Sequence, residues 1–196
     1  TAFRDDGNDM MITATTGYKV FDLGTKTLIK NGWLTKPNII FVNNYINEDT
    51  YDELLLRVEE GLINERIEYS KAYDNFIVNN EYRNDVLVNL VNKYKDKKIL
   101  ILVKRIEHGE TLNELLEDSE YLYGETNKTE RGEIFDKFKN GNLKVLIGTL
   151  SIFAEGIDIP SLDVVINAGA NRGEVKTIQI LGRVLRKMEG KENAYY

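Results

Sequence analysis

Apolar residues divide the second half of the chain into alternating strand-like and helix-like segments. Three short runs are almost continuously apolar: "KKILILVK" (97–104), "LKVLIGT" (143–149) and "LDVVINAG" (162–169). Such runs are typical of strands that are buried on both faces of a parallel sheet. Between them, "HGETLNELLED" (108–118) and "NKTERGEIFDKFKNG" (127–141) predict helices, the second one stopped by Gly141.

The remaining segments extend this alternation in both directions. We predict a strand in "PNIIFV" (37–42), two or three helices from about residue 48 to 94, and a short strand in "YLYG" (121–124). The segment "GEVKTIQILGRVLR" (173–186) predicts a helix, and "NAYY" (193–196) the start of a final strand. This order predicts an α/β fold with an open parallel sheet, flanked by helices on both faces, with ligands at the carboxyl ends of the strands.

The first 36 residues differ from the rest because they show no clear period. We expect residues 1–36 to form a connector with a small helix and an irregular arm, and residues 37–196 to form the folded domain. The chain opens on "TAFR" without a start methionine. We therefore expect it to be part of a longer protein.

Composition excludes several classes of protein. The 196 residues include no cysteine and one histidine, so we expect no disulfide and no metal site built from these residues. No apolar run reaches the roughly 18 residues that span a bilayer, and the N-terminus lacks signal-peptide features, so we expect a cytoplasmic protein without a membrane partner. The net charge of -6 argues against wrapping of nucleic acid but permits a local basic surface.

The most distinctive candidate residues lie in "IQILGRVLR" (178–186). Gln179, Arg183 and Arg186 follow at i, i+4 and i+7, so a helix would place all three on one face. Apolar residues take the opposite side, and Gly182 would allow a close backbone approach. Two interpretations remain open at this point: a solvated basic face of an amphipathic helix, or a site for a phosphate group.

A second group of candidates follows the strand at 143–149, in "GTLSIFAEGIDIP" (148–160). Thr149 ends the strand and can donate to a phosphate, Gly156 leaves backbone exposed, and Asp158 can accept hydrogen bonds from ribose hydroxyls. The alternative is that Asp158 only caps a turn and Thr149 only ends a strand.

The order of these pieces resembles the second RecA-like domain, the helicase C-terminal domain, of superfamily 2 helicases and translocases. "ILILVKRIEHGETLNELL" is similar to the motif IV strand and helix, "GTLSIFAEGIDIP" to motif V, and "QILGRVLR" to motif VI. The resemblance covers residues 98–196 closely. Upstream it is weaker and points to the phage and bacterial branch related to DNA-repair helicases.

The resemblance implies a RecA-like fold and an ATP-driven motor on nucleic acid, with ATP and magnesium held mainly by an N-terminal RecA-like domain of the same parent chain. It implies that Arg183 and Arg186 reach the γ-phosphate as arginine fingers with Gln179 beside them. Gly156 and Asp158 would contact the nucleotide sugar or the coupling elements. It also implies a nucleic-acid surface at the strand ends, made by Thr149, Arg105, His108 and the turn at Gly124. For His108 the alternative is a helix N-terminal residue in water.

The departures from the family pattern matter as much. This chain contains no G-x-x-x-x-G-K-[ST] phosphate loop and no Asp-Glu pair after an apolar strand, so we expect the chain alone to be inactive as an ATP hydrolase and to bind no nucleotide by itself. Glu155 before Gly156 favours DNA over RNA as the partner. The alternatives are the translocase part of a restriction enzyme, a Rossmann-like module for a phosphorylated ligand, and a protein-interaction domain that has lost motor function.

Overall fold

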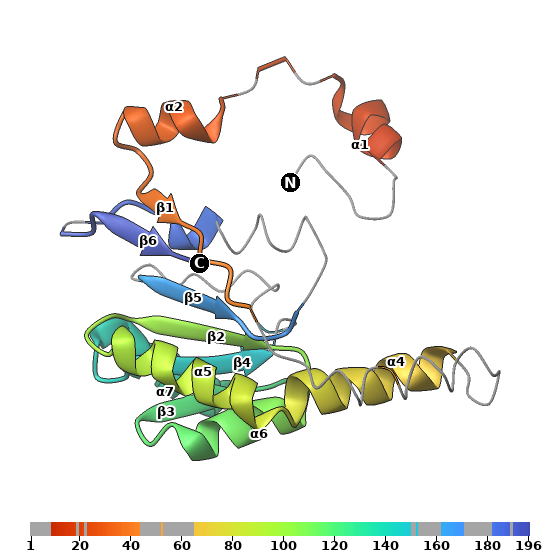
Figure 1. The fold of residues 1–196 in the computed structure, drawn as a ribbon. Coiled ribbons are helices and arrows are strands. Elements are labelled where there is room, and N and C mark those ends of the chain that lie inside the picture. Colours follow the sequence, from red (N-terminus) through yellow and green to blue (C-terminus); the bar gives the residue numbers. More distant parts are fainter. Residues whose placement is uncertain are drawn as a thin grey trace.

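The protein folds around a single parallel β-sheet with the strand order β1-β6-β5-β2-β4-β3 (Figure 1). The computed structural model describes residues 9–18, 20–21, 23–43, 52, 65–149, 152, 162–170, 182–188 and 190–196. The strands are β1 (Lys36–Asn38), β2 (Ile99–Val103), β3 (Ser119–Leu122), β4 (Val145–Thr149), β5 (Val164–Asn167) and β6 (Asn193–Tyr195). Every strand pair that the structure describes is parallel, which confirms the predicted sheet.

Helices lie before and between these strands in the sequence. They are α1 (Asp9–Thr16), α2 (Thr25–Lys30), α4 (Glu65–Tyr73), the π-helix η1 (Asp74–Val78), α5 (Glu81–Lys93), α6 (Ile106–Leu115) and α7 (Lys128–Asn140). The side chain of Asn127 accepts a hydrogen bond from the backbone N–H of Glu130 at 2.8 Å and so caps α7. Gly141 ends the same helix with a φ of 84°, a conformation that glycine adopts without strain. The predicted helix therefore has the predicted end.

The central strand β2 is buried along its whole length, because helices cover both faces of the sheet (Figure 1). Its side chains alternate between two cores. One core lies between the sheet and α7, and the other between the sheet and α5 with α6. The first takes Leu100 and Leu102 of β2 with Ile134 and Phe138 of α7, and the second takes Ile99, Ile101 and Val103 with Leu87, Val91 and Leu112. Each fully buried side chain of this size contributes about 1.5–3 kcal/mol.

Two predicted strands have different bounds in the structure. The strand expected at 37–42 is present only as Lys36–Asn38, because β1 pairs with the three residues of β6 and with no further strand that the structure describes. One hydrogen bond continues the pairing, from the N–H of Ile40 to the carbonyl of Tyr196 at 2.7 Å. The strand expected at 121–124 begins two residues earlier, at Ser119. Within the described residues, no helix is long and apolar enough to cross a membrane.

Gly109 is required by the contact between α6 and β3. A Cβ at this position would lie 2.3 Å from the ring of Tyr121, whereas a Cβ at Gly132 of α7 would meet nothing within 4 Å. We expect Gly109→Ala to lower the free energy of unfolding by about 1–2 kcal/mol, since overpacking outweighs the gain in helix propensity.

Gly132→Ala is the matched control. The same change in an open helical position should raise the free energy of unfolding by up to about 1 kcal/mol. Urea denaturation of both variants measures the difference. Equal effects of the two substitutions would show that α6 and β3 do not pack as described.

Candidate functional site

The carboxyl ends of the central strands bring several of the predicted residues to one edge of the sheet. β2, β4 and β3 are neighbours and parallel, and Arg105, Thr149 and Gly124 lie at or just after their ends. Thr149 is opposite Val103 and is largely buried, whereas Gly124 is exposed in a turn. The guanidinium of Arg131 donates to the Thr126 carbonyl at 3.3 Å and so holds this turn.

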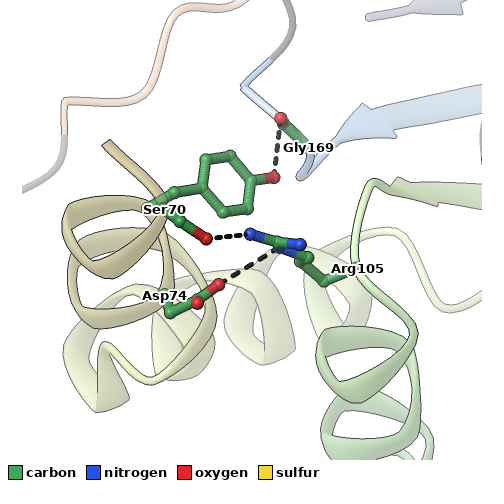
Figure 2. A network of polar contacts seen from close by, with 5 residues as sticks. Ser70, Asp74, Arg105 and Gly169 are labelled. Atoms are coloured by element: carbon green, nitrogen blue, oxygen red, sulfur yellow. Dashed lines mark hydrogen bonds and ion pairs between the residues drawn. The ribbon is translucent and has the colours of Figure 1, made fainter. Parts of the chain in front are cut away.

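Side chains of α4 and η1 hold Arg105 at this edge (Figure 2). Its Nη2 donates to the hydroxyl of Ser70 at 2.6 Å, and its Nε lies 3.2 Å from a carboxylate oxygen of Asp74. The guanidinium also lies 5.7 Å from the centre of the Tyr73 ring. The side chains of Arg105 and Asp74 are 38% and 43% exposed, so water screens the ion pair and it contributes less than about 1 kcal/mol. A stronger anion can therefore displace Asp74 at small cost.

Lys104 adds a second positive charge beside Arg105. Its ammonium lies 4.8 Å from the centre of the Tyr73 ring and 5.4 Å from that of Tyr69. Tyr69 is 63% exposed. The edge of the sheet thus presents two cations and an exposed aromatic ring, which together can bind phosphate groups and stack on a base.

Two helices bond to the loop that follows β5, α4 through Tyr73 and α5 through Arg83. The hydroxyl of Tyr73 donates to the Gly169 carbonyl at 2.8 Å (Figure 2), and Nη2 of Arg83 donates to the Ala168 carbonyl at 2.6 Å. Burial raises the pKa of Tyr73 to about 12, so the hydroxyl remains a donor at neutral pH. The next residue, Ala170, has a φ of 46°, which is strained for a residue other than glycine.

The structure corrects the prediction for His108. Its side chain has no exposed surface, and Nε2 lies 3.1 Å from the carbonyl oxygen of the Asn84 side chain. The amide nitrogen of Asn84 donates to the Val78 carbonyl, so its oxygen is an acceptor and the proton lies on Nε2. Burial and the charge of Arg83 lower the pKa of His108 to about 4. His108 therefore joins α6 to α5 as a neutral group, and it neither faces a phosphate chain nor lies in water.

Arg183 and Arg186 lie in a different part of the sheet from Arg105. Residues 182–184 are helical, Leu185 is in a turn, and Arg186 forms an antiparallel bridge with Leu34. Thr35, just before the amino end of β1, donates its N–H to the Leu185 carbonyl at 2.8 Å. We call residues 183–186 the arginine turn.

This placement corrects two expectations. Arg186 has left the helix and forms a bridge with Leu34 in the segment before β1, so it does not share a helical face with Arg183. Gly182 provides no close approach either, since a Cβ there would meet nothing within 4 Å among the described residues. Arg183 is half-buried and Arg186 is exposed. Both arginines thus lie on a turn near the amino ends of the strands, and not at the carboxyl ends where Arg105 lies.

Three predicted residues, Gln179, Gly156 and Asp158, lie outside the described residues. Conversely, the residues that hold Arg105 were not predicted, since Ser70 and Asp74 belong to a helix whose position opposite β2 no local pattern reveals. Lys191 was also missed. It is buried, with its ammonium bonded to the carbonyls of Val184 and Leu162, and the only signal in the sequence is a lysine between Gly190 and the final strand.

The described residues hold no group of three or more His, Cys, Asp or Glu side chains placed to bind a metal ion.

The chain is similar to several known proteins. Residues 82–188 match the family described as the helicase conserved C-terminal domain. A protein of Sulfolobus islandicus filamentous virus (isolate Iceland/Hveragerdi) is 28% identical over the whole chain, which covers 35% of that protein. The DNA 3'-5' translocase XPB2 of Sulfurisphaera tokodaii is 29% identical over 59% of the chain and 26% of its own length. The chain thus spans about a third or less of these relatives.

A solved structure shows the same fold. Dbp5 of S. cerevisiae, bound to RNA and ADP BeF3, superposes with a TM-score of 0.59 over 100% of this chain and 43% of that one, at 19% identity. The resemblance to superfamily 2 helicase C-terminal domains and the RecA-like fold that it implied are confirmed.

The buried His108 makes stability depend on pH. Its pKa is about 4 in the folded protein and 6.5 when unfolded, so between these values the unfolded chain binds more protons and acidification favours unfolding. We expect the free energy of unfolding to fall by about 2 kcal/mol between pH 7 and pH 5 on account of this residue.

The variant His108→Gln tests this prediction, since glutamine can donate to Asn84 without titrating. Urea denaturation from pH 7 to pH 5 should show a smaller loss of stability for the variant than for the unchanged protein. The same pH dependence in both proteins would show that His108 is not the group responsible.

Proposed function

Because the chain belongs to the helicase conserved C-terminal domain family, we propose that it is the second motor domain of an ATP-dependent nucleic-acid helicase or translocase. In this proposal Arg183 and Arg186 act as arginine fingers on ATP bound mainly by a first RecA-like domain of a longer protein. The strand ends contact the nucleic acid. The motor is proposed to work in the cytoplasm.

The arginine turn is the observation that carries the proposal. It places two permanently charged guanidinium groups on a backbone that is tied to Thr35, and one of them is exposed. Negative charge develops on the phosphoryl oxygens during ATP hydrolysis, and a planar guanidinium fork stabilises that charge. Such a group accelerates hydrolysis only if it is fixed before the reaction begins. A backbone-bonded turn satisfies this requirement better than a freely solvated helix face would.

The residues present fit the γ-phosphate end of ATP but not the whole nucleotide. Two guanidinium groups complement phosphoryl oxygens, whereas the chain has no phosphate loop, and its described part has no carboxylate cluster for magnesium. ATP would supply the phosphoanhydride bond whose cleavage drives the motor. Gln179, Gly156 and Asp158 remain proposed partners of the nucleotide. The proposal assigns the magnesium ion and most phosphate contacts to the first domain.

The nucleic-acid contacts are proposed for Arg105 and Lys104, with Thr149 and the turn at Gly124 beside them. Support comes from the screened Arg105–Asp74 pair, which a phosphate can replace. We propose DNA as the substrate, following Glu155 before Gly156, and include RNA in the tests. The relatives support either choice, since one is named a DNA translocase and the other was solved with RNA. Membership of the helicase family argues against the alternative of a Rossmann-like module that binds a phosphorylated ligand.

Removing a proposed finger tests the nucleotide role. In the full-length protein, Arg186→Ala should lower kcat for nucleic-acid-stimulated ATP hydrolysis by about 10³-fold while ATP still binds, because charge stabilisation is lost only in the transition state. Lys187→Ala, a change of the exposed neighbouring cation, is the matched control and should leave kcat within about twofold of the unchanged value. If Arg186→Ala hydrolyses ATP normally, the arginine turn has another role.

Two substitutions around Arg105 test the nucleic-acid role with opposite signs. Arg105→Gln should weaken binding of single-stranded DNA and reduce the slope of log K against log salt by about 1, since one phosphate contact is lost. Asp74→Asn should tighten binding, because it removes the anion that competes with the phosphate. Fluorescence anisotropy across a salt series, with DNA and RNA strands of the same sequence, measures both effects.

Lys137→Gln serves as the control for net charge. Lys137 pairs with Glu120 at the surface, and its loss should leave the salt slope unchanged. Equal weakening by Lys137→Gln and Arg105→Gln would point to a diffuse charge effect and contradict a contact at Arg105.

A further inference from the structure

We propose that Lys191 is a positioning residue for the arginine turn, holding the backbone between Arg183 and Arg186 in the geometry that aims their side chains. This inference rests on the proposed function of the two arginines. It assigns a role in ATP hydrolysis to a residue that itself touches no nucleotide.

The ammonium of Lys191 joins the arginine turn to the sheet. Its Nζ donates to the carbonyl of Val184 and to the carbonyl of Leu162, each at 2.5 Å. Val184 is the residue after Arg183, and Leu162 lies two residues before β5, a strand whose first two residues are buried. One side chain therefore fixes the turn relative to the rigid centre of the domain.

The burial of a lysine at this point needs an explanation beyond packing. Lys191 is 8% exposed, and burial lowers its pKa, which Asp163 partly opposes. Burying an ammonium is costly unless hydrogen bonds replace its water, and an apolar side chain would fill the same space without that cost. What the ammonium provides, and an apolar residue cannot, is a pair of charge-assisted bonds to backbone carbonyls. The geometry thus favours a role in fixing backbone position.

A second residue holds the next two carbonyls of the turn. Thr35 is 1% exposed, and its N–H donates to the Leu185 carbonyl at 2.8 Å. Its hydroxyl lies 3.4 Å from the Arg186 carbonyl, a longer and weaker bond. Three successive carbonyls, at residues 184, 185 and 186, are therefore held by the side chains of Lys191 and Thr35 and by the backbone N–H of Thr35. The side chains of Val184 and Leu185 add anchorage, since both are buried in the core shared with α7.

The consequence for catalysis is preorganisation. A guanidinium must lie within about 0.5 Å of its productive position to stabilise charge fully, and a displacement of 1 Å can cost about 10²-fold in rate. The carbonyls of residues 184, 185 and 186 are restrained, so little freedom remains except in the arginine side chains themselves. Loosening this backbone should affect kcat rather than ATP binding, because the first domain holds most of the nucleotide.

The experiment compares five variants of the full-length protein: Lys191→Met, Thr35→Val, Arg186→Ala, the double variant Lys191→Met with Arg186→Ala, and Lys98→Met. Lys98 is a matched control, since its ammonium also bonds a backbone carbonyl, that of Lys139 at 2.7 Å, but far from the arginine turn in the sequence. The measurements are kcat and KM for ATP at saturating nucleic acid, together with the thermal midpoint of unfolding.

We expect Lys191→Met to lower kcat by about 10- to 100-fold with KM for ATP changed less than about threefold, and Thr35→Val to lower kcat in the same manner but less. Adding Lys191→Met to Arg186→Ala should cause little further loss, because a positioning residue has no effect once the positioned group is gone. Lys98→Met should leave kcat unchanged.

Each contrary result has a distinct meaning. If Arg186→Ala keeps its kcat, the proposed function fails. If Arg186→Ala loses kcat while folded Lys191→Met retains it, or if the losses in the double variant multiply, the inference about Lys191 fails and the lysine is only structural. If Lys191→Met does not fold, Lys191→Gln, which keeps an uncharged donor at this position, and its double variant with Arg186→Ala decide the matter by the same criteria.

Discussion

The burial of β2 on both faces is the constraint from which the rest of the structure follows. Its five residues, Ile99–Val103, are buried and alternate between two separate cores, so helices must cover each face of the sheet. Strands joined by covering helices run parallel, and all their carboxyl ends then meet at one edge. That edge carries Arg105 and the residues that hold it. The same crossover connections return the chain to the opposite edge, where the strands begin and where the N–H of Thr35 donates to the Leu185 carbonyl.

The two proposed activities therefore occupy different parts of one rigid sheet. The strand ends present cations and an exposed aromatic ring that suit a nucleic-acid strand, and the arginine turn presents guanidinium groups that suit a phosphoryl group. The loop after β5 lies beside the first of these parts. Tyr73 and Arg83 bond its carbonyls from the nucleic-acid side, and the chain continues from this loop toward residues 182–186.

The sequence predicted those features whose causes are local. Continuous apolar runs identified β2, β4 and β5, and the asparagine cap and Gly141 identified α7, because each signal lies within the element itself. Features that depend on distant partners were not predictable. His108 is buried by Asn84, 24 residues away, and Arg186 leaves its helix because residues 34 and 35, about 150 positions upstream, pair with the turn. The buried Lys191 is of the same kind in part, since one of its two acceptors, the Leu162 carbonyl, lies 29 positions upstream.

The central claim is that the arginine turn reaches a nucleotide held by another domain. The most direct measurement is a structure of the full-length protein with a nucleic-acid strand and ADP carrying a fluoride mimic of the transferred phosphoryl group. We expect the guanidinium of Arg183 or Arg186 to lie within hydrogen-bonding distance of the mimic while Arg105 contacts a nucleic-acid phosphate. A structure in which both arginines contact the nucleic acid, or solvent alone, with the mimic bound elsewhere, would contradict it.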